Sequence, residues 1–128
     1  MKSAPLVTIV TPSYNQASYL EETINSVLSQ TYPSIEYIII DGGSSDGSLE
    51  IINKYASRFA KWVSEKDRGQ TEAINKGFAL AKGEVLAWLN SDDTFLPNTI
   101  EEAVSYLSAH PKQAWFMGTP ITLMKKVK

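Results

Sequence analysis

The chain has 128 residues, of which 43% are hydrophobic and 20% charged, with a formal net charge of −2 and no cysteine. This composition is ordinary for one soluble globular domain, gives no reason to expect a nucleic-acid partner, and excludes disulfides and thiolate metal sites. No apolar run approaches the ~18 residues of a spanning helix and no signal-like segment is evident, so we expect a cytoplasmic protein.

Strand and helix patterns alternate from the beginning of the chain. The β-branched run Leu6–Val10 predicts a strand that ends at Thr11-Pro12, where proline blocks continuation. Ser18, with Glu21 three residues later, then predicts the capped start of a helix. The next run, at 35–40, is apolar almost throughout, which is typical of a parallel strand covered on both faces.

The same alternation continues through the second half. The remaining predicted elements are a loop at 41–48, a helix around 49–59, a weak strand at 60–63, a helix at 71–81 with Ile74, Phe78 and Ala81 inward, a strand at 85–89, a helix from 97 to 110, and strands at 115–117 and 121–124. Strand–helix repetition with short loops predicts an α/β fold, with a mostly parallel sheet flanked by helices.

Carboxylates stand where two of these strands end. Asn90-Ser91-Asp92-Asp93 follows the apolar strand at 85–89, and Asp41 follows the strand at 35–40. Adjacent carboxylates at the end of a buried strand repel each other and lose hydration, so a cation or a set of hydrogen-bond donors must offset that cost. Parallel strands deliver these acids to one rim, which is where open α/β sheets bind ligands.

Six segments in collinear order resemble family 2 glycosyltransferases. They are residues 7–15, 26–32, 40–48, 67–70, 73–77 and 88–93. The resemblance implies a Rossmann-like GT-A fold, apparently truncated, with a donor-binding subdomain at 1–118 and a divergent basic tail at 119–128. It further implies metal-assisted transfer of a sugar from a nucleotide diphosphate, commonly UDP, to a hydroxyl acceptor.

The resemblance also assigns roles at the nucleotide. Asp41 would accept a hydrogen bond from N3–H of uracil, while Thr11, Pro12 and Tyr14 would form the wall around base and ribose. Tyr14 offers a flat apolar surface suited to that wall. An alternative stays open, in which Pro12 is a turn residue and Asp41 caps the following loop.

Asp92 and Asp93 resemble the family's DXD-type element in a Ser-Asp-Asp form. Asp92 would contact the ribose, and Asp93 would bind a divalent cation, Mn²⁺ or Mg²⁺, that bridges the diphosphate oxygens. Asp67, Arg68 and Gly69 could line the donor pocket, and Arg68 suits a phosphate or a carboxylate. A solvated turn is the alternative for the acid pair, and a structural role is equally open for Arg68.

A general base is missing from the pattern. The family places it downstream of the metal motif, whereas no carboxylate follows Glu102, so the catalytic residues stay unknown. An inverting transfer needs such a base. We therefore expect either a glycosyltransferase whose acceptor half is absent from this chain or a nucleotide-sugar-binding module without turnover.

The expected partners follow from these two readings. They are a nucleotide-sugar donor and a sugar, lipid-linked or protein acceptor in polysaccharide biosynthesis, with peripheral association with membrane machinery left open. Self-association through an apolar sheet edge is also expected. A phospho-receiver domain is disfavoured, because its acid pair follows the first strand and its single aspartate the third.

Overall fold

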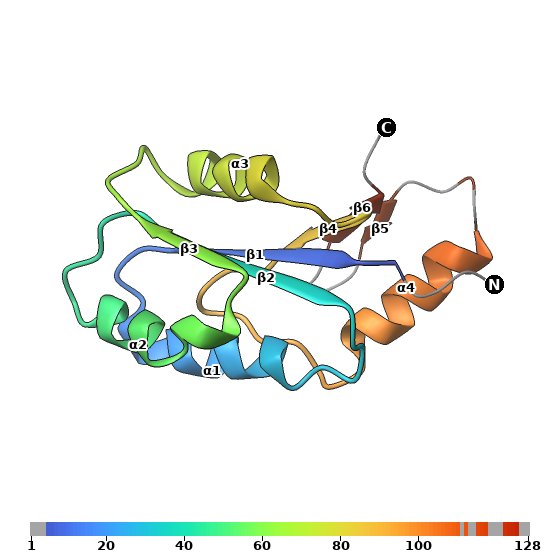
Figure 1. Ribbon diagram of the computed structural model, residues 1–128, viewed down its shortest axis with the longest axis horizontal. Helices are drawn as coiled ribbons and strands as arrows, with labels where there is room; N and C mark the ends of the chain where they lie inside the picture. The colour runs from blue at the N-terminus through green and yellow to red at the C-terminus, as the bar shows by residue number, and fades with distance from the viewer. Residues whose placement is uncertain (1–4, 111, 113–114, 118–121, 126–128) are drawn as a thin grey trace.

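The computed structural model describes residues 5–110, 112, 115–117 and 122–125. They form one six-stranded sheet with helices on both faces (Figure 1). The strands are β1 Val7–Ser13, β2 Ile35–Asp41, β3 Lys61–Ser64, β4 Val85–Trp88, β5 Trp115–Met117 and β6 Thr122–Lys125. The helices are α1 Ala17–Leu28, α2 Ser48–Lys54, the 3-10 turn η1 Ala56–Arg58, α3 Gln70–Leu80 and α4 Thr99–Ala109.

The sheet is parallel over its first four strands and antiparallel at one side. Its order is β3-β2-β1-β4-β6-β5, with β1 paired in parallel to both β2 and β4. β6 pairs antiparallel with β4 and with β5, within the segment predicted as a tail. The predicted mostly parallel sheet with flanking helices is therefore confirmed.

Two hydrophobic layers cover the sheet, because alternate residues of each strand point to opposite faces. On one face, Ile9 and Ile39 pack with α1, α2 and α4 in the larger cluster. On the other, Val10, Ile38 and Ile40 pack under α3. The carboxyl ends of the four parallel strands are thus held at one rim by a core on both sides.

α3 makes its closest contact with β1 through small residues that were not predicted to face inward. Its fully buried positions are Ala73 and Gly77, whereas Ile74 and Phe78 are half-buried. A Cβ on Gly77 would lie 2.5 Å from Cγ1 of Val10, so the helix backbone sits almost directly on the strand. The small residues allow this close approach. Of the three residues predicted to face inward, Ala81 is buried and Phe78 packs against the cluster on this face, while Ile74 is only half-buried.

β1 continues through the proline that was predicted to end it. Ser13 O accepts the N–H of Gly42 on the β2 side, while Val10 O accepts the N–H of Leu89 on the β4 side. Backbone groups alternate sides along a strand, so the nitrogen of Pro12 faces the β4 side, beyond the last β1–β4 pair. No bond to β2 is lost there, and the strand tolerates proline.

The start of α1 also differs from the predicted capping box. The helix begins at Ala17, and its N-cap residue Gln16 makes no side-chain capping hydrogen bond. Instead, the backbone N–H of Ala17 donates to Oδ2 of Asp46, 3.0 Å away in the loop before α2. The exposed amide is satisfied by a distant carboxylate, which a local pattern cannot predict.

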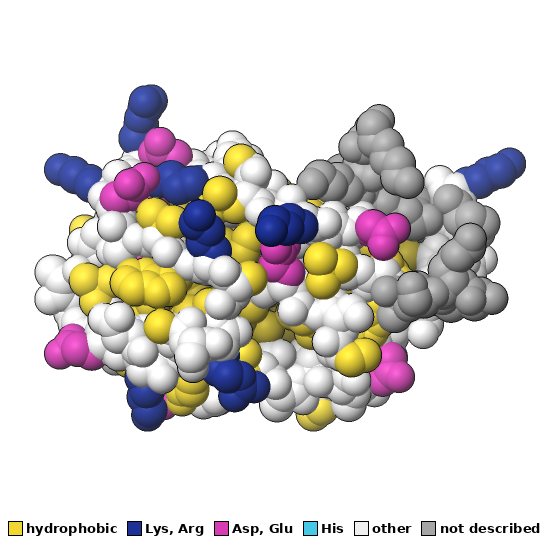
Figure 2. Space-filling model, viewed as in Figure 1, with side chains coloured by type: hydrophobic (Ala, Val, Ile, Leu, Met, Phe, Trp, Pro, Cys, Tyr) yellow, Lys and Arg dark blue, Asp and Glu magenta, His cyan; other side chains and the backbone are white. Residues whose placement is uncertain are grey.

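The surface shows no concentration of one charge on the face in view. Figure 2 shows Lys and Arg interspersed with Asp and Glu, with hydrophobic side chains in the middle, where Figure 1 places the edge strand β3. Self-association through an apolar sheet edge stays a prediction. None of the described helices has the length and hydrophobicity needed to cross a lipid bilayer.

Candidate functional site

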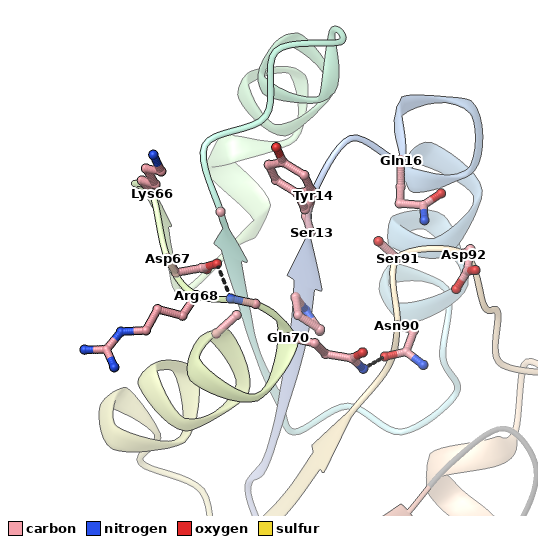
Figure 3. A pocket seen from close by; sticks show the side chains of 14 residues that line it. Ser13, Tyr14, Gln16, Lys66, Asp67, Arg68, Gln70, Asn90, Ser91 and Asp92 are labelled. Carbon is pink, nitrogen blue, oxygen red and sulfur yellow. Dashed lines mark hydrogen bonds between the residues drawn. The ribbon is translucent and has the colours of Figure 1, made fainter.

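A pocket of about 560 Å³ opens at the carboxyl ends of the parallel strands (Figure 3). This volume lies in the range of small-molecule sites. Each parallel strand contributes through the loop that follows it, and the lining residues are Pro12, Ser13, Tyr14, Gln16, Gly42, Lys66, Asp67, Arg68, Gly69, Gln70, Ala73, Asn90, Ser91 and Asp92. The predicted rim of strand ends is therefore the rim of a real cavity.

The structure brings four of the seven predicted site residues to this pocket: Pro12, Tyr14, Arg68 and Asp92. The Tyr14 side chain is 61% exposed. The guanidinium of Arg68 extends away from the pocket centre in Figure 3. The other three predicted residues do not line the cavity, and two of them are fully buried.

Those two buried residues are Thr11 and Asp41, both 0% exposed. The hydroxyl of Thr11 lies 2.8 Å from the phenol oxygen of Tyr37. Burial raises the pKa of Tyr37 above its ordinary value, and the hydrogen bond with Thr11 only partly opposes that rise. Asp93, the third, is partly exposed and lies in the same loop as Asp92. Thr11 thus stands behind the pocket wall rather than on it.

The buried carboxylate of Asp41 lies beneath the rim and accepts five hydrogen bonds. Its Oδ1 accepts the hydroxyls of Ser13 at 3.0 Å and Ser44 at 2.6 Å. Its Oδ2 accepts the N–H groups of Gly43 at 3.0 Å and Ser44 at 2.8 Å, and the hydroxyl of Ser64 at 2.9 Å. A carboxylate offers about four lone-pair sites, so five donors saturate it. Asp41 therefore joins the ends of β1, β2 and β3 and caps the loop after β2.

The same network fixes the loop that carries Tyr14. Asn15 has a φ of +51°, a conformation that asparagine tolerates better than most residues. Its N–H donates to Oγ of Ser44 at 2.8 Å, and its Oδ1 accepts the N–H of Ser45 at 2.9 Å. Because Ser44 also bonds Asp41, the buried carboxylate is connected through one side chain to the pocket wall.

The acidic loop after β4 is anchored by a residue that the sequence analysis did not identify. Thr23, buried on α1, places its hydroxyl 3.0 Å from Ser91 O and 2.7 Å from Asp93 O. The N–H of Asp93 donates to Asn90 O at 3.0 Å, closing a tight turn. A threonine among the apolar residues on the inner face of α1 was the available signal.

A divalent cation fits this loop only with help from a ligand. Among the described residues no three His, Cys, Asp or Glu side chains converge as a metal cluster. Asp92 is exposed and Asp93 partly exposed, so their oxygens are accessible. Mg²⁺ and ions like it often bind through one or two carboxylates, with phosphate oxygens and water completing the shell. The donor set therefore suits a metal–phosphate complex.

On the opposite side of the pocket, Asp67 has an unused oxygen. Its Oδ1 accepts the N–H of Gly69 at 3.0 Å. Its Oδ2 is buried and has no hydrogen-bond partner in the part of the chain that the structure describes. Gln70 and Asn90 hydrogen-bond through their side-chain amides and join the Asp67 loop to the acidic loop. The pocket thus has carboxylates at both ends.

The chain is similar in sequence to known glycosyltransferases. The family model for glycosyl transferase family 2 matches residues 8–126. An uncharacterized glycosyltransferase of Mycobacterium tuberculosis is 42% identical over 110 residues, covering 84% of this chain and 42% of the relative. A putative teichuronic acid biosynthesis glycosyltransferase of Bacillus subtilis, TuaG, is 37% identical over 106 residues, covering 80% and 42%. The chain thus spans less than half the length of these relatives.

Two solved structures share the fold. The mannosyltransferase PcManGT from Pyrobaculum calidifontis, in complex with GDP-Man and Mn²⁺, superposes with a TM-score of 0.82 at 24% identity, over 97% of this chain and 45% of that one. TarS of S. aureus (residues 1–349), in complex with UDP-GlcNAc, gives 0.75 at 25% identity, over 83% and 32%.

Proposed function

The chain belongs to glycosyl transferase family 2 and has the GT-A fold, and we propose that its pocket binds the nucleotide-diphosphate part of a sugar donor. The observation that carries the proposal is the pocket itself, which lies at the ends of the parallel strands and has exposed Asp92 in its lining, with partly exposed Asp93 next in the same loop. The similar structures PcManGT and TarS are in complex with GDP-Man and UDP-GlcNAc respectively, which supports a nucleotide sugar as the ligand.

We assign the nucleoside to the part of the pocket bounded by Pro12 and Tyr14. The exposed ring of Tyr14 supplies a flat apolar surface for the base, and Pro12 supplies the wall beside it. Thr11 and Asp41 act from beneath, because both are buried and hold the strand ends and loops that form this wall. Direct contact of Asp41 with the base would require one of its five present donors to leave.

We assign the ribose and diphosphate to the opposite side. Asp92 accepts hydrogen bonds from ribose hydroxyls, and Asp93 contributes a ligand to Mn²⁺ or Mg²⁺ together with diphosphate oxygens. When bound, such an ion neutralises negative charge on the departing diphosphate. Thr23 holds the backbone of both acids in place through Ser91 O and Asp93 O. Arg68 reaches a phosphate only after its side chain turns toward the pocket.

The reaction of the whole protein belongs to the same proposal. The donor would be UDP-linked, the acceptor would present a hydroxyl on a sugar, a lipid-linked molecule or a protein, and transfer would invert the anomeric centre. Inversion needs a base that deprotonates the acceptor. We do not assign that base to Asp92 or Asp93, because both serve the donor in this arrangement.

Calorimetric titration with UDP and GDP, with and without Mn²⁺, tests the donor site. We expect Mn²⁺ to tighten binding of at least one diphosphate, and Asp93→Asn to abolish that metal dependence. Glu22→Gln is the matched control, because it removes one exposed carboxylate on α1. Absence of metal-enhanced binding would overturn the donor site, whereas full metal dependence in Asp93→Asn would place the ion elsewhere.

A binding module without turnover is the second candidate, because Asp92 and Asp93 are both assigned to the donor and neither is left to act as the base. The chain spans 42% of the length of two of its relatives, so the activity of those whole proteins stays a proposal for it. Sugar transfer or slow donor hydrolysis, measured across a panel of nucleotide sugars, separates the two candidates. Turnover supports the enzyme, and tight metal-dependent binding without turnover supports the module.

A further inference from the structure

Polar side chains along one side of α1 hold the loop that carries Asp92 and Asp93. They are Thr23 and Ser26 on the helix and Gln30 shortly after its end, and all three lie outside the pocket lining. We propose that they form a template that positions the acidic loop for the donor, with Ser26 and Gln30 as positioning residues. The inference rests on the proposed function, because it concerns the loop that would receive the diphosphate.

The contacts follow the same order along the helix and along the loop. Thr23 holds the acidic turn itself through two backbone carbonyls. One turn further on, Oγ of Ser26 accepts the N–H of Phe95 at 3.1 Å and donates to Thr23 O at 2.7 Å. Nε2 of Gln30 then donates to Leu96 O at 2.6 Å. The chain between β4 and α4 is thus laid alongside α1, as Figure 1 also shows.

The side-chain amide of Gln30 uses both its donors and its acceptor. Nε2 donates to Ser26 O at 3.0 Å as well as to Leu96 O, and Oε1 accepts the N–H of Ile100 at 3.0 Å. Turning the amide over would set its oxygen against two carbonyl oxygens. A carboxylate would do the same, because it donates no hydrogen bond. Only a primary amide therefore satisfies all three partners.

Gln30 also connects the loop to the beginning of α4. Ile100 lies in the first turn of that helix, where backbone N–H groups have no partner within the helix. The N-cap residue Asn98 makes no side-chain capping hydrogen bond, so the cap comes from Gln30. Beside it, the N–H of Thr31 donates to Pro97 O at 2.9 Å. The path of the chain from the acidic turn to α4 is therefore fixed at both ends.

The exposure of the two acids explains why the backbone of the loop matters for the donor. Asp92 is exposed and Asp93 partly exposed, so the position of each carboxylate follows from the backbone that carries it. A loop that must be ordered when a ligand binds loses affinity, whereas a loop held in place beforehand does not. Removing part of the template should therefore weaken the binding that depends on the acid pair.

The first test measures how much Mn²⁺ tightens the binding of UDP and GDP, as the ratio of Kd without and with the metal. Gln30→Met keeps the length of the side chain, and Ser26→Ala removes one hydroxyl. We expect each to lower this ratio roughly threefold to tenfold, while Ser26→Thr retains the hydroxyl and recovers it. Ile52→Ala, in the core beneath α2, should lower the unfolding midpoint but keep the wild-type ratio.

The second test follows amide hydrogen exchange in the protein without ligand. In Gln30→Met the N–H of Ile100 loses its acceptor and should exchange faster. If the contacts act in series, exchange should also become faster at the N–H of Asp93, which closes the acidic turn. Thr31→Val is the control, because it removes only the side-chain hydrogen bond to Glu101 and should leave both rates unchanged.

The outcomes separate the template from the donor site. A wild-type ratio in folded Gln30→Met and Ser26→Ala overturns the positioning role and leaves the donor site standing, and so does an equal loss in Ile52→Ala. Faster exchange confined to Ile100 makes Gln30 a cap of α4 only and overturns the template. If wild type binds no diphosphate, the proposed function fails, whereas faster exchange that reaches Asp93 still supports the template.

Discussion

The end of β2 and the loop after β3 each bring a carboxylate to the same rim, but the two carboxylates differ in their hydrogen bonding. Asp41, the last residue of β2, is buried and receives five hydrogen bonds, from the ends of β1 and β3 and from the loop after β2. Asp67, in the loop after β3, accepts the N–H of Gly69, and its other oxygen is buried and unpaired among the described residues. The contrast separates a carboxylate whose acceptor sites are all used from one with an unused acceptor site.

The largest expected effect is on stability, when the fully hydrogen-bonded carboxylate of Asp41 is removed. Asp41→Ala should lower the free energy of unfolding by about 3–5 kcal/mol, because it leaves the hydroxyls of buried Ser13 and Ser44, that of partly buried Ser64, and two amides without their acceptor. Urea denaturation measures the change. Asp67→Ala is the matched variant and should stay within about 1 kcal/mol of wild type. Equal losses in the two variants would erase the distinction between the two acids.

An intermediate effect is expected where α1 meets the acidic loop. Thr23→Val keeps the shape of the side chain but removes the hydroxyl that donates to Ser91 O and Asp93 O. We expect a loss of about 1–3 kcal/mol in the free energy of unfolding, and weaker Mn²⁺-dependent nucleotide binding. Thr23→Ser retains the donor and should recover most of both. Loss of metal dependence without loss of stability would argue against an anchoring role.

A smaller effect on stability but a clear effect on binding is expected at Gly42. The added methyl of Gly42→Ala meets the end of the Asp67 side chain, which can move aside, so stability should change by less than about 1 kcal/mol. The displaced carboxylate would narrow the pocket that Gly42 and Asp67 both line, so nucleotide binding should weaken about tenfold in calorimetry. In an Asp67→Ala background the same substitution should add nothing. An additive loss would show that Gly42 acts independently of Asp67.

The smallest effect concerns pH and the loop before α2. Hydrogen bonds from the Ser48 hydroxyl and the Ala17 amide lower the pKa of Asp46 below its ordinary value of 3.8. The stabilisation is therefore present above pH 3.8 and is lost as pH falls through the lower folded-state pKa. Asp46→Asn should flatten this part of the acid-unfolding profile only slightly, because the side chain is exposed. An unchanged profile would show that the loop does not depend on this charge.

The sequence predicted the fold from alternation and the pocket from the acids at strand ends, because both depend on local pattern. The saturation of Asp41 depends on Ser13 and Ser64, which approach from neighbouring strands and lie 28 and 23 residues away in sequence. The anchoring of the acidic loop by Thr23 spans an even longer separation. Local pattern identifies which side chains carry charge, whereas pairing between strands decides which of those charges are already used.

Local rules failed in the same way at Gly77 and at the start of α1. Helical periodicity favours bulky inward residues, but close contact between α3 and Val10 leaves room only for glycine. The N-terminus of α1 is capped from another loop rather than by its own first turn. In each case a tertiary contact outweighs the local preference, which is the usual limit of propensity.

The proline in β1 has a consequence for the shape of the pocket. The ladder bond after Leu89 N–H to Val10 O would run from residue 12 to Leu89 O, and proline has no N–H to make it. β1 therefore continues beside β2, whereas the chain after β4 turns away, so β1 and the chain after β4 separate at this point. Pro12 and Asn90 line the opening between them. The missing N–H of Pro12 thus lies where the pairing of β1 with β4 ends and the pocket opens.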